Sequence, residues 1–219
     1  MALLVLSDTE ALSHVREDHS RWPLTAKAQA DRLTPFAQPH FQPSFGINKH
    51  ESIFTIGSCF ARNIEKQLLV EGYNVALPRF APPEDPAFKA EADTLLHRFT
   101  VHSIVNDLTW ALDPQQPFPQ EGFVEVAAGE WIDLQLSPLL AASSRAMVEA
   151  RRRAVRAYFA LAAEARVFIM TLGLAEVWFD TLTGTYLNAQ PPTRVRKAYP
   201  GRFQFHLTEY DEVLHHRAG

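Results

Sequence analysis

Two short runs of apolar residues, each ended by a glycine, predict buried strands. The sequence "SIFTIG" covers residues 52–57, and "VFIMTLG" covers residues 167–173. Both runs are rich in β-branched residues and lack the alternation of apolar and polar positions that marks a strand with one face in water. We therefore expect residues 53–56 and 167–172 to be central strands of a mostly parallel sheet.

Apolar residues at intervals of three and four predict helices between the strands. Phe60, Ile64 and Leu68 lie four residues apart, and Gly72 follows them. Residues 59–71 are therefore predicted to form a helix with these three side chains on its apolar face. A second helix is predicted over residues 102–112.

A third predicted helix covers residues 144–166 and has two contrasting faces. One face carries six small or apolar side chains, those of Met147, Ala150, Ala154, Tyr158, Leu161 and Ala165. The other face carries four arginines, which are expected to be solvated: Arg151, Arg152, Arg153 and Arg156.

The order of these elements predicts an α/β fold. A further strand over residues 73–77, "YNVAL", would complete a strand–helix–strand unit, whose crossover favours a parallel pair. Helices are expected on both faces of the sheet, in a domain that covers residues 51–219. Residues 1–50 contain prolines at positions 35, 39 and 43 and are predicted to form a proline-rich, extended arm.

Composition narrows the classes of function. The formal net charge of −4 over 219 residues gives no electrostatic reason to expect nucleic-acid binding. The single cysteine excludes an internal disulfide. The apolar run at residues 2–6 is too short for a signal peptide or a membrane span, so the expected location is the cytoplasm. Neither a phosphate-binding glycine loop nor zinc-ligand spacing occurs, so no cofactor and no metal are expected.

The turn Gly57-Ser58-Cys59 carries the strongest candidate chemistry. In open α/β sheets, ligands bind outside the carboxyl ends of the strands, and both this turn and residues 173–176 occupy such ends. Cys59 opens a helix, where unpaired N–H groups favour an anion, so its thiol is either a reactive nucleophile or a small packed side chain. Ser58 is either the N-cap of that helix or the nucleophile instead. The pattern predicts one site that joins the two turns.

The same residues resemble the GSCFA family, which is named after the pentapeptide that residues 57–61 spell in full. Further matching blocks are "FIMTLGLAEVWFD", "GEWIDLQLSP" and "FQFHLTEYDEVL", and the similarity runs from about residue 44 to the end of the chain. The family is similar in turn to the SGNH/GDSL hydrolases. This resemblance implies a three-layer α/β/α, flavodoxin-like fold and an enzyme that handles esters or acyl groups.

The resemblance also implies a role for the residues of the two turns. Cys59, two residues after Gly57, takes the position of the superfamily's nucleophilic serine. Gly173 begins the block that supplies an oxyanion donor. Because Ala175 has no side-chain donor, the backbone N–H groups of Cys59 and Gly173 are expected to bind the oxyanion. Glu176 either orients a base, binds a polar substrate group or is a plain surface carboxylate.

A general base is the part that the sequence does not supply. The superfamily's base is a histidine near the C-terminus. Here Asp211 or Glu212 shares a helix face with His215, which predicts an exposed ion pair. His102 begins a predicted helix and could reach the site, and His206 lies in a predicted strand. The resemblance thus implies a chain that lacks the family's final strand and its base.

The resemblance therefore implies an SGNH-like esterase or acyltransferase, with poor turnover expected in this form because no base is supplied. Its expected substrate is a small-molecule or carbohydrate-borne acyl ester, and neither nucleic acid nor a membrane is an expected partner. The alternative is a ligand-binding module that uses the same fold without catalysis. The oligomeric state is not indicated by the sequence.

Overall fold

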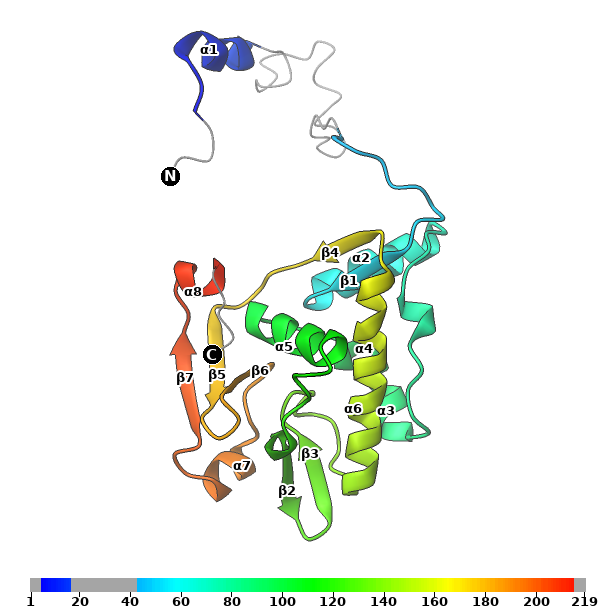
Figure 1. The fold of residues 1–219 in the computed structure, drawn as a ribbon, viewed down its shortest axis with the longest axis vertical. Coiled ribbons are helices and arrows are strands. Elements are labelled where there is room, and N and C mark those ends of the chain that lie inside the picture. The colour runs from blue at the N-terminus through cyan, green and yellow to red at the C-terminus, as the bar shows by residue number, and fades with distance from the viewer. Residues whose placement is uncertain (1–4, 17–42, 215–219) are drawn as a thin grey trace, which may run out of the picture. The chain divides into compact units, whose positions relative to one another are not determined.

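The computed structural model describes residues 5–16 and 43–214, whose helices and strands are drawn in Figure 1. The chain divides into two units, residues 1–46 and 47–219. The first unit contains the helix α1 (Asp8–Arg16), which the predicted arm did not include. Ser7 and Glu10 cap its start through reciprocal hydrogen bonds of 2.9 and 3.3 Å. Pro35 and Pro39, on which the prediction of an extended arm rested, lie outside the described residues.

Helices and short strands alternate along the second unit. Its helices are α2 (Cys59–Val70), α3 (Pro86–Ala90), α4 (Ala92–Leu95), α5 (Val101–Leu112), α6 (Arg145–Ala160), α7 (Thr193–Ala198) and α8 (Tyr210–Leu214). Its strands are β1 (Ile53–Ile56), β2 (Phe123–Ala127), β3 (Glu130–Asp133), β4 (Val167–Met170), β5 (Glu176–Asp180), β6 (Thr185–Leu187) and β7 (Phe203–Leu207). Short 3₁₀ helices cover Leu77–Arg79, Gln120–Gly122 and Leu161–Glu164.

The two glycine-ended runs form a parallel strand pair, as predicted. The register of β1 and β4 aligns Ile53 with Val167 and Ile56 with Met170, so both strands end at the same edge. On the other side of β1, the predicted strand over residues 73–77 is reduced to one isolated parallel bridge between Val75 and Ile53. In Figure 1 the two strands point the same way above α5.

The strand β4 is not central, which differs from the prediction. Its outer side pairs with no described strand, and Phe168 and Met170 are 41% and 44% exposed. The other sheets are antiparallel: a β2–β3 hairpin and a three-stranded sheet in the order β6-β5-β7. The mixture of helices and small sheets confirms an α/β protein. A continuous, mostly parallel sheet is not seen among the described residues.

The helix α6 buries a different face from the one predicted. Its buried residues are Val148, Arg151, Arg152, Val155, Tyr158 and Phe159. Arg153 and Arg156 are exposed, as predicted. The prediction that Arg151 and Arg152 are solvated was wrong, because both are buried. The reason is pairing inside the protein: Arg151 donates to Asp85 at 2.6 Å, and Arg152 contacts two further aspartates. A buried arginine is stable when acidic groups satisfy its charge and its N–H donors.

The helix α2 also departs from the predicted apolar face. Phe60 is 70% exposed and Ile64 39% exposed, whereas Ala61, Arg62 and Glu65 are buried. The main core lies between β1, α5 and α6 and is built from Phe54, Ile56, Ala76, Phe88, Leu95, Leu96, Ile104, Leu136, Leu140, Val155, Tyr158 and Phe159. Within the described ranges, no helix combines the length and apolar character needed to cross a bilayer.

Candidate functional site

The turn after β1 brings a glycine, a helix cap and the cysteine together. Gly57 has a φ of +144°, and a Cβ at this position would lie 2.1 Å from Thr171 Oγ1, so only glycine fits. Ser58 is the N-cap of α2, and its side chain accepts a hydrogen bond from the Phe60 N–H at 3.4 Å. Cys59 is the first helical residue, and it is exposed with a free thiol. Ser58 therefore has the capping role that was one of its two predicted roles. Cys59 is not a small side chain packed in the interior, because it is exposed.

The turn after β4 lies beside the first turn. The Thr171 N–H donates to the Ile56 carbonyl at 3.0 Å, which continues the parallel pairing to the end of both strands. Gly173 follows two residues later, and a Cβ there would lie 2.7 Å from the Phe99 carbonyl oxygen. Glu176 is the first residue of β5 and is exposed. Both glycines thus stand where another backbone segment approaches closely.

A segment that sequence reasoning missed joins the two turns. The N–H of Arg98 donates to the Gly57 carbonyl at 2.7 Å, and the carbonyl of Phe99 accepts from the Leu174 N–H at 2.8 Å. One residue further on, Thr100 caps α5. We call residues 97–100 the bridging segment. No sequence motif marks this segment. The sequence signal for it was its position directly before the predicted helix that became α5.

Backbone donors remain available at this edge. The N–H groups of Cys59 and Gly173 donate to no residue in the part of the chain that the structure describes, whereas the Leu174 N–H is bonded to the bridging segment. Thr171 Oγ1 is buried and likewise has no hydrogen-bond partner among these residues. An exposed thiol beside unpaired N–H groups is an arrangement that can receive a carbonyl carbon and its oxygen.

Two of the predicted histidines, His102 and His206, lie in one cluster with Tyr186 and Glu212. His102 is buried in the first turn of α5 and stacks on Tyr186 with ring centroids 4.1 Å apart, and its Nε2 lies 3.9 Å from Glu212 Oε1. The Tyr186 hydroxyl donates to Glu212 Oε1 at 2.6 Å and lies 3.1 Å from His206 Nδ1. Burial, then the hydrogen bond to Glu212, raises the pKa of Tyr186 to about 12. His215 lies outside the described residues.

No described imidazole forms a hydrogen bond with the Cys59 thiol. The contacts of His102 that are given above are with Tyr186 and Glu212, and those of His206 are with Tyr186 and Gln204. Tyr186 and Glu212 were not predicted as companions of His102. Glu212 was noted only as a partner for His215, and nothing in the spacing indicates Tyr186.

Comparison with protein-family models decides the relationship. The model of the GSCFA family matches residues 52–218, which is most of the chain. The chain belongs to the GSCFA family. A search of curated proteins and a search of solved structures each found no match. The family's pentapeptide is thus the β1–α2 turn and the first turn of α2 described above.

The residue that follows the GSCFA pentapeptide anchors α2 to β1. Arg62 donates to the Thr55 carbonyl and, at 2.7 Å, to Thr55 Oγ1, and it donates to the Tyr158 hydroxyl at 3.0 Å. It also forms an ion pair with Glu65, which in turn accepts from the Tyr158 hydroxyl at 3.3 Å. The Arg62 and Glu65 side chains are 3% and 0% exposed. This network fixes the start of α2, and hence Cys59, against the strand that precedes it.

The buried Glu65 predicts a pH dependence of stability. Burial raises the pKa of Glu65 above its ordinary value of 4.5, and the Arg62 charge offsets this only in part. The folded state therefore keeps the Glu65 proton at pH values where the unfolded chain has released it. The stabilising contribution of this group is complete below about pH 4.5 and is lost as the pH rises through the folded pKa.

Urea unfolding of the wild type and of Glu65→Gln, followed across acid to neutral pH, measures this contribution. The difference in unfolding free energy, wild type minus variant, is expected to fall as the pH rises above about 4.5 and then to level off. Glu71→Gln, at the exposed end of the same helix, serves as the control for the chemical change itself. A pH-independent difference for Glu65→Gln would contradict the raised pKa.

Proposed function

We propose that this chain is an SGNH-like acyl-transferring protein, an esterase or acyltransferase in which Cys59 is the nucleophile. The observation that carries the proposal is the exposed Cys59 thiol in the first turn of α2, at the carboxyl end of a parallel strand pair. A helix N-terminus favours an anionic group, and ligands of α/β proteins gather at this end of the strands. The superfamily relationship and its flavodoxin-like layout are part of this proposal, as is an acyl ester as substrate.

In the proposed chemistry the Cys59 thiol first gives its proton to water, and the resulting thiolate sulfur attacks an ester carbonyl carbon. The carbonyl oxygen becomes an oxyanion, for which the N–H groups of Cys59 and Gly173 are the proposed donors, since neither has a backbone acceptor among the described residues. The oxyanion then re-forms the carbonyl, the ester C–O bond breaks, and the alcohol leaves with a proton from water. The product is a thioester on Cys59. Water or an acceptor hydroxyl attacks this thioester, which releases the acyl group and restores the thiol.

The second step, release of the acyl group from Cys59, is expected to be slow because no imidazole among the described residues forms a hydrogen bond with the thiol. A positioned base contributes about 10²–10⁴-fold in rate, so release of the acyl group by water lacks that acceleration. Treatment with p-nitrophenyl acetate should therefore give one acetyl group per chain, visible by intact-protein mass spectrometry, followed by little turnover. Peptide mapping should place the acetyl group on Cys59.

The controls separate an activated thiol from any exposed thiol. Cys59→Ala should remain unmodified, and Ser58→Ala should still be acylated, since Ser58 acts as the cap. In the double variant Cys59→Ala/Asn63→Cys the thiol sits one turn further along α2, at an exposed position where the helical N–H groups are paired. We expect Cys59 to react about 10²-fold faster than this thiol, the effect of one or more oxyanion donors. Equal rates would reject the proposal.

The second candidate function is ligand binding without catalysis. It is favoured by the same lack of an imidazole on Cys59 within the described ranges. Under this alternative, acyl esters would protect Cys59 from alkylation reversibly, and no covalent acetyl group would accumulate. Robust turnover that is abolished by Cys59→Ala would contradict both the slow second step and the binding-only alternative, and would direct attention to His102.

A further inference from the structure

The bridging segment contacts both glycine turns without belonging to either. It donates one hydrogen bond to the Gly57 carbonyl and accepts one from the Leu174 N–H. At Gly173 it approaches so closely that a Cβ would lie 2.7 Å from the Phe99 oxygen. The relative position of the Cys59 and Gly173 N–H groups therefore depends on where this segment is held.

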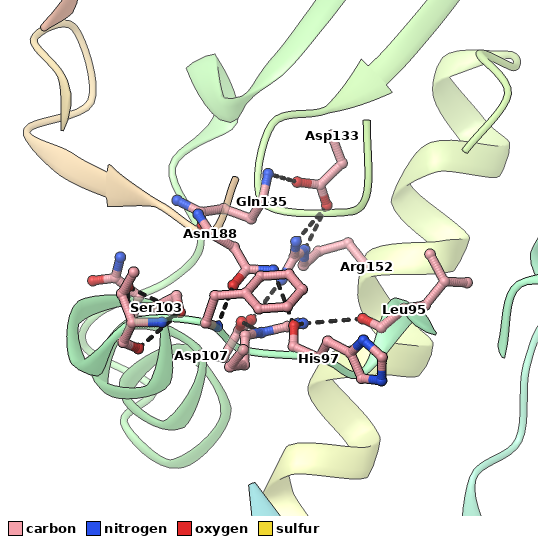
Figure 2. A network of polar contacts seen from close by, with 12 residues as sticks. Leu95, His97, Ser103, Asp107, Asp133, Gln135, Arg152 and Asn188 are labelled. Atoms are coloured by element: carbon pink, nitrogen blue, oxygen red, sulfur yellow. Dashed lines mark hydrogen bonds and ion pairs between the residues drawn. The ribbon is translucent and has the colours of Figure 1, made fainter. Parts of the chain in front are cut away.

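One buried side chain fixes the backbone of the bridging segment on both sides of Arg98. The Asn188 amide donates through Nδ2 to the His97 carbonyl at 2.9 Å and accepts through Oδ1 from the Phe99 N–H at 3.1 Å. The Asn188 backbone N–H donates to Gln135 Oε1 at 3.1 Å, which holds the asparagine in place. Asn188 and Gln135 are only 6% and 2% exposed. Figure 2 shows Asn188 between Gln135 and the His97 backbone.

The side chain of Arg98 provides a second anchor for the bridging segment. It forms an ion pair with Asp107 of α5 and donates to the Leu95 carbonyl at 3.0 Å. Asp107 also pairs with Arg152 at 2.6 Å, and Arg152 pairs with Asp133 at 2.6 Å. These four side chains, which we call the buried charge chain, are at most 6% exposed (Figure 2). Removing one member leaves a buried charge unpaired, which endangers folding itself, so Asn188 offers the cleaner test.

We propose that Asn188 is a positioning residue for the Cys59 site. It touches neither turn. It acts through the His97 and Phe99 backbone, which sets the distance between the two N–H groups that would receive the oxyanion. This inference rests on the proposed function, and it adds a specific residue that neither the pentapeptide nor the Gly173 block contains.

The test compares two reactions of the same thiol. Acylation by p-nitrophenyl acetate passes through an oxyanion, whereas alkylation by iodoacetamide displaces iodide and forms none. A purely structural defect that exposes or loosens Cys59 changes both rates together. Loss of oxyanion positioning lowers the acylation rate alone, so the ratio of acylation rate to alkylation rate isolates the proposed role.

We expect Asn188→Ala to lower this ratio about tenfold, less than the 10²–10³-fold cost of losing an oxyanion donor outright because the donors are displaced rather than removed. Asn188→Ser replaces the amide with a shorter, neutral hydroxyl that cannot pair with both backbone groups at once, so its ratio should be intermediate. Asn106→Ala is the matched control, since Asn106 donates to the Tyr186 carbonyl at 2.8 Å in the strand β6, which ends one residue before Asn188, and this hydrogen bond is not to the bridging segment. Its ratio should equal that of the wild type.

Circular dichroism verifies that each variant is folded at the assay temperature, and Asn188→Ser carries the test if Asn188→Ala does not fold. An unchanged ratio in folded Asn188 variants overturns the positioning role while leaving the proposed function intact. If the wild type is alkylated but never acylated, the proposed function fails, and the positioning role fails with it.

Discussion

Replacing Arg152 with methionine is expected to destabilise the protein by about 3–5 kcal/mol, the usual cost of removing one partner of a buried ion pair. Arg152 is 5% exposed and pairs with Asp107 and Asp133 at 2.6 Å each. Without it, Asp133 keeps only the hydrogen bond from the Gln135 N–H at 2.8 Å among the described contacts. A carboxylate that is buried without a cation is costly, and methionine fills a similar volume without supplying one. Urea unfolding followed by far-ultraviolet circular dichroism measures the loss.

The neighbouring residue provides the control. Arg153 lies on the same helix and is exposed, so Arg153→Met should change the unfolding free energy by no more than about 0.5 kcal/mol. The double variant Arg152→Met/Asp133→Asn should recover part of the stability, because the unpaired charge is then removed. Similar losses for Arg152→Met and Arg153→Met would show that the buried charge chain contributes nothing.

Gly57→Ala is expected to destabilise the protein by about 3 kcal/mol or more and to abolish acylation of Cys59. Two costs add: a positive φ for an L-residue, about 1–2 kcal/mol, and a steric clash, about 1–3 kcal/mol. The added Cβ would lie 2.6 Å from the Thr171 carbonyl oxygen, a backbone atom directly after the strand β4 that cannot rotate away. Relief requires β1 and β4 to separate, which moves the Cys59 turn from the Gly173 turn.

Gly72→Ala separates the two costs. Gly72 has a φ of +80°, and a Cβ there meets no atom within 4 Å, so this variant carries the backbone cost alone. Its expected loss is about 1–2 kcal/mol, with acylation of Cys59 unchanged. Thermal and urea unfolding of both variants, together with the acylation assay, test the comparison. Equal losses would mean that the close approach of Thr171 is relaxed at little cost.

The strands and the turns of the candidate site were readable from the sequence because the information there is local. Two short apolar runs, both rich in β-branched residues, predicted the two strands that pair in the structure. The glycine at the end of each run stands where another backbone segment approaches closely. The residue type of Ser58 indicated either a cap or a nucleophile, and the structure shows it as the cap. The start of α2 at Cys59 was correct for the same reason.

The buried faces of the helices were not readable, because charged residues there satisfy one another across distant parts of the chain. Arg151 pairs with Asp85, 66 residues away, and Arg62 reaches Tyr158, 96 residues away. An argument from periodicity places such charged residues on the solvent-exposed face, because their hydrogen-bond or ion-pair partners are distant in the sequence. The bridging segment was missed for a related reason. It contacts the two turns through backbone N–H and carbonyl groups, which every residue type can supply, so the sequence does not mark it. Asn188 could be found only once its two hydrogen bonds to that segment were seen.

The buried charge chain also constrains how the family can diverge. Its two arginines and two aspartates cancel, and they come from the bridging segment, α5, β3 and α6. A mutation that changes one member leaves a net charge in the interior, so an ancestor that lost Arg152 would have needed a compensating change at Asp107 or Asp133. Among relatives, these positions should therefore be inherited together or replaced together. Four residues that are scattered over the gene would evolve as one unit.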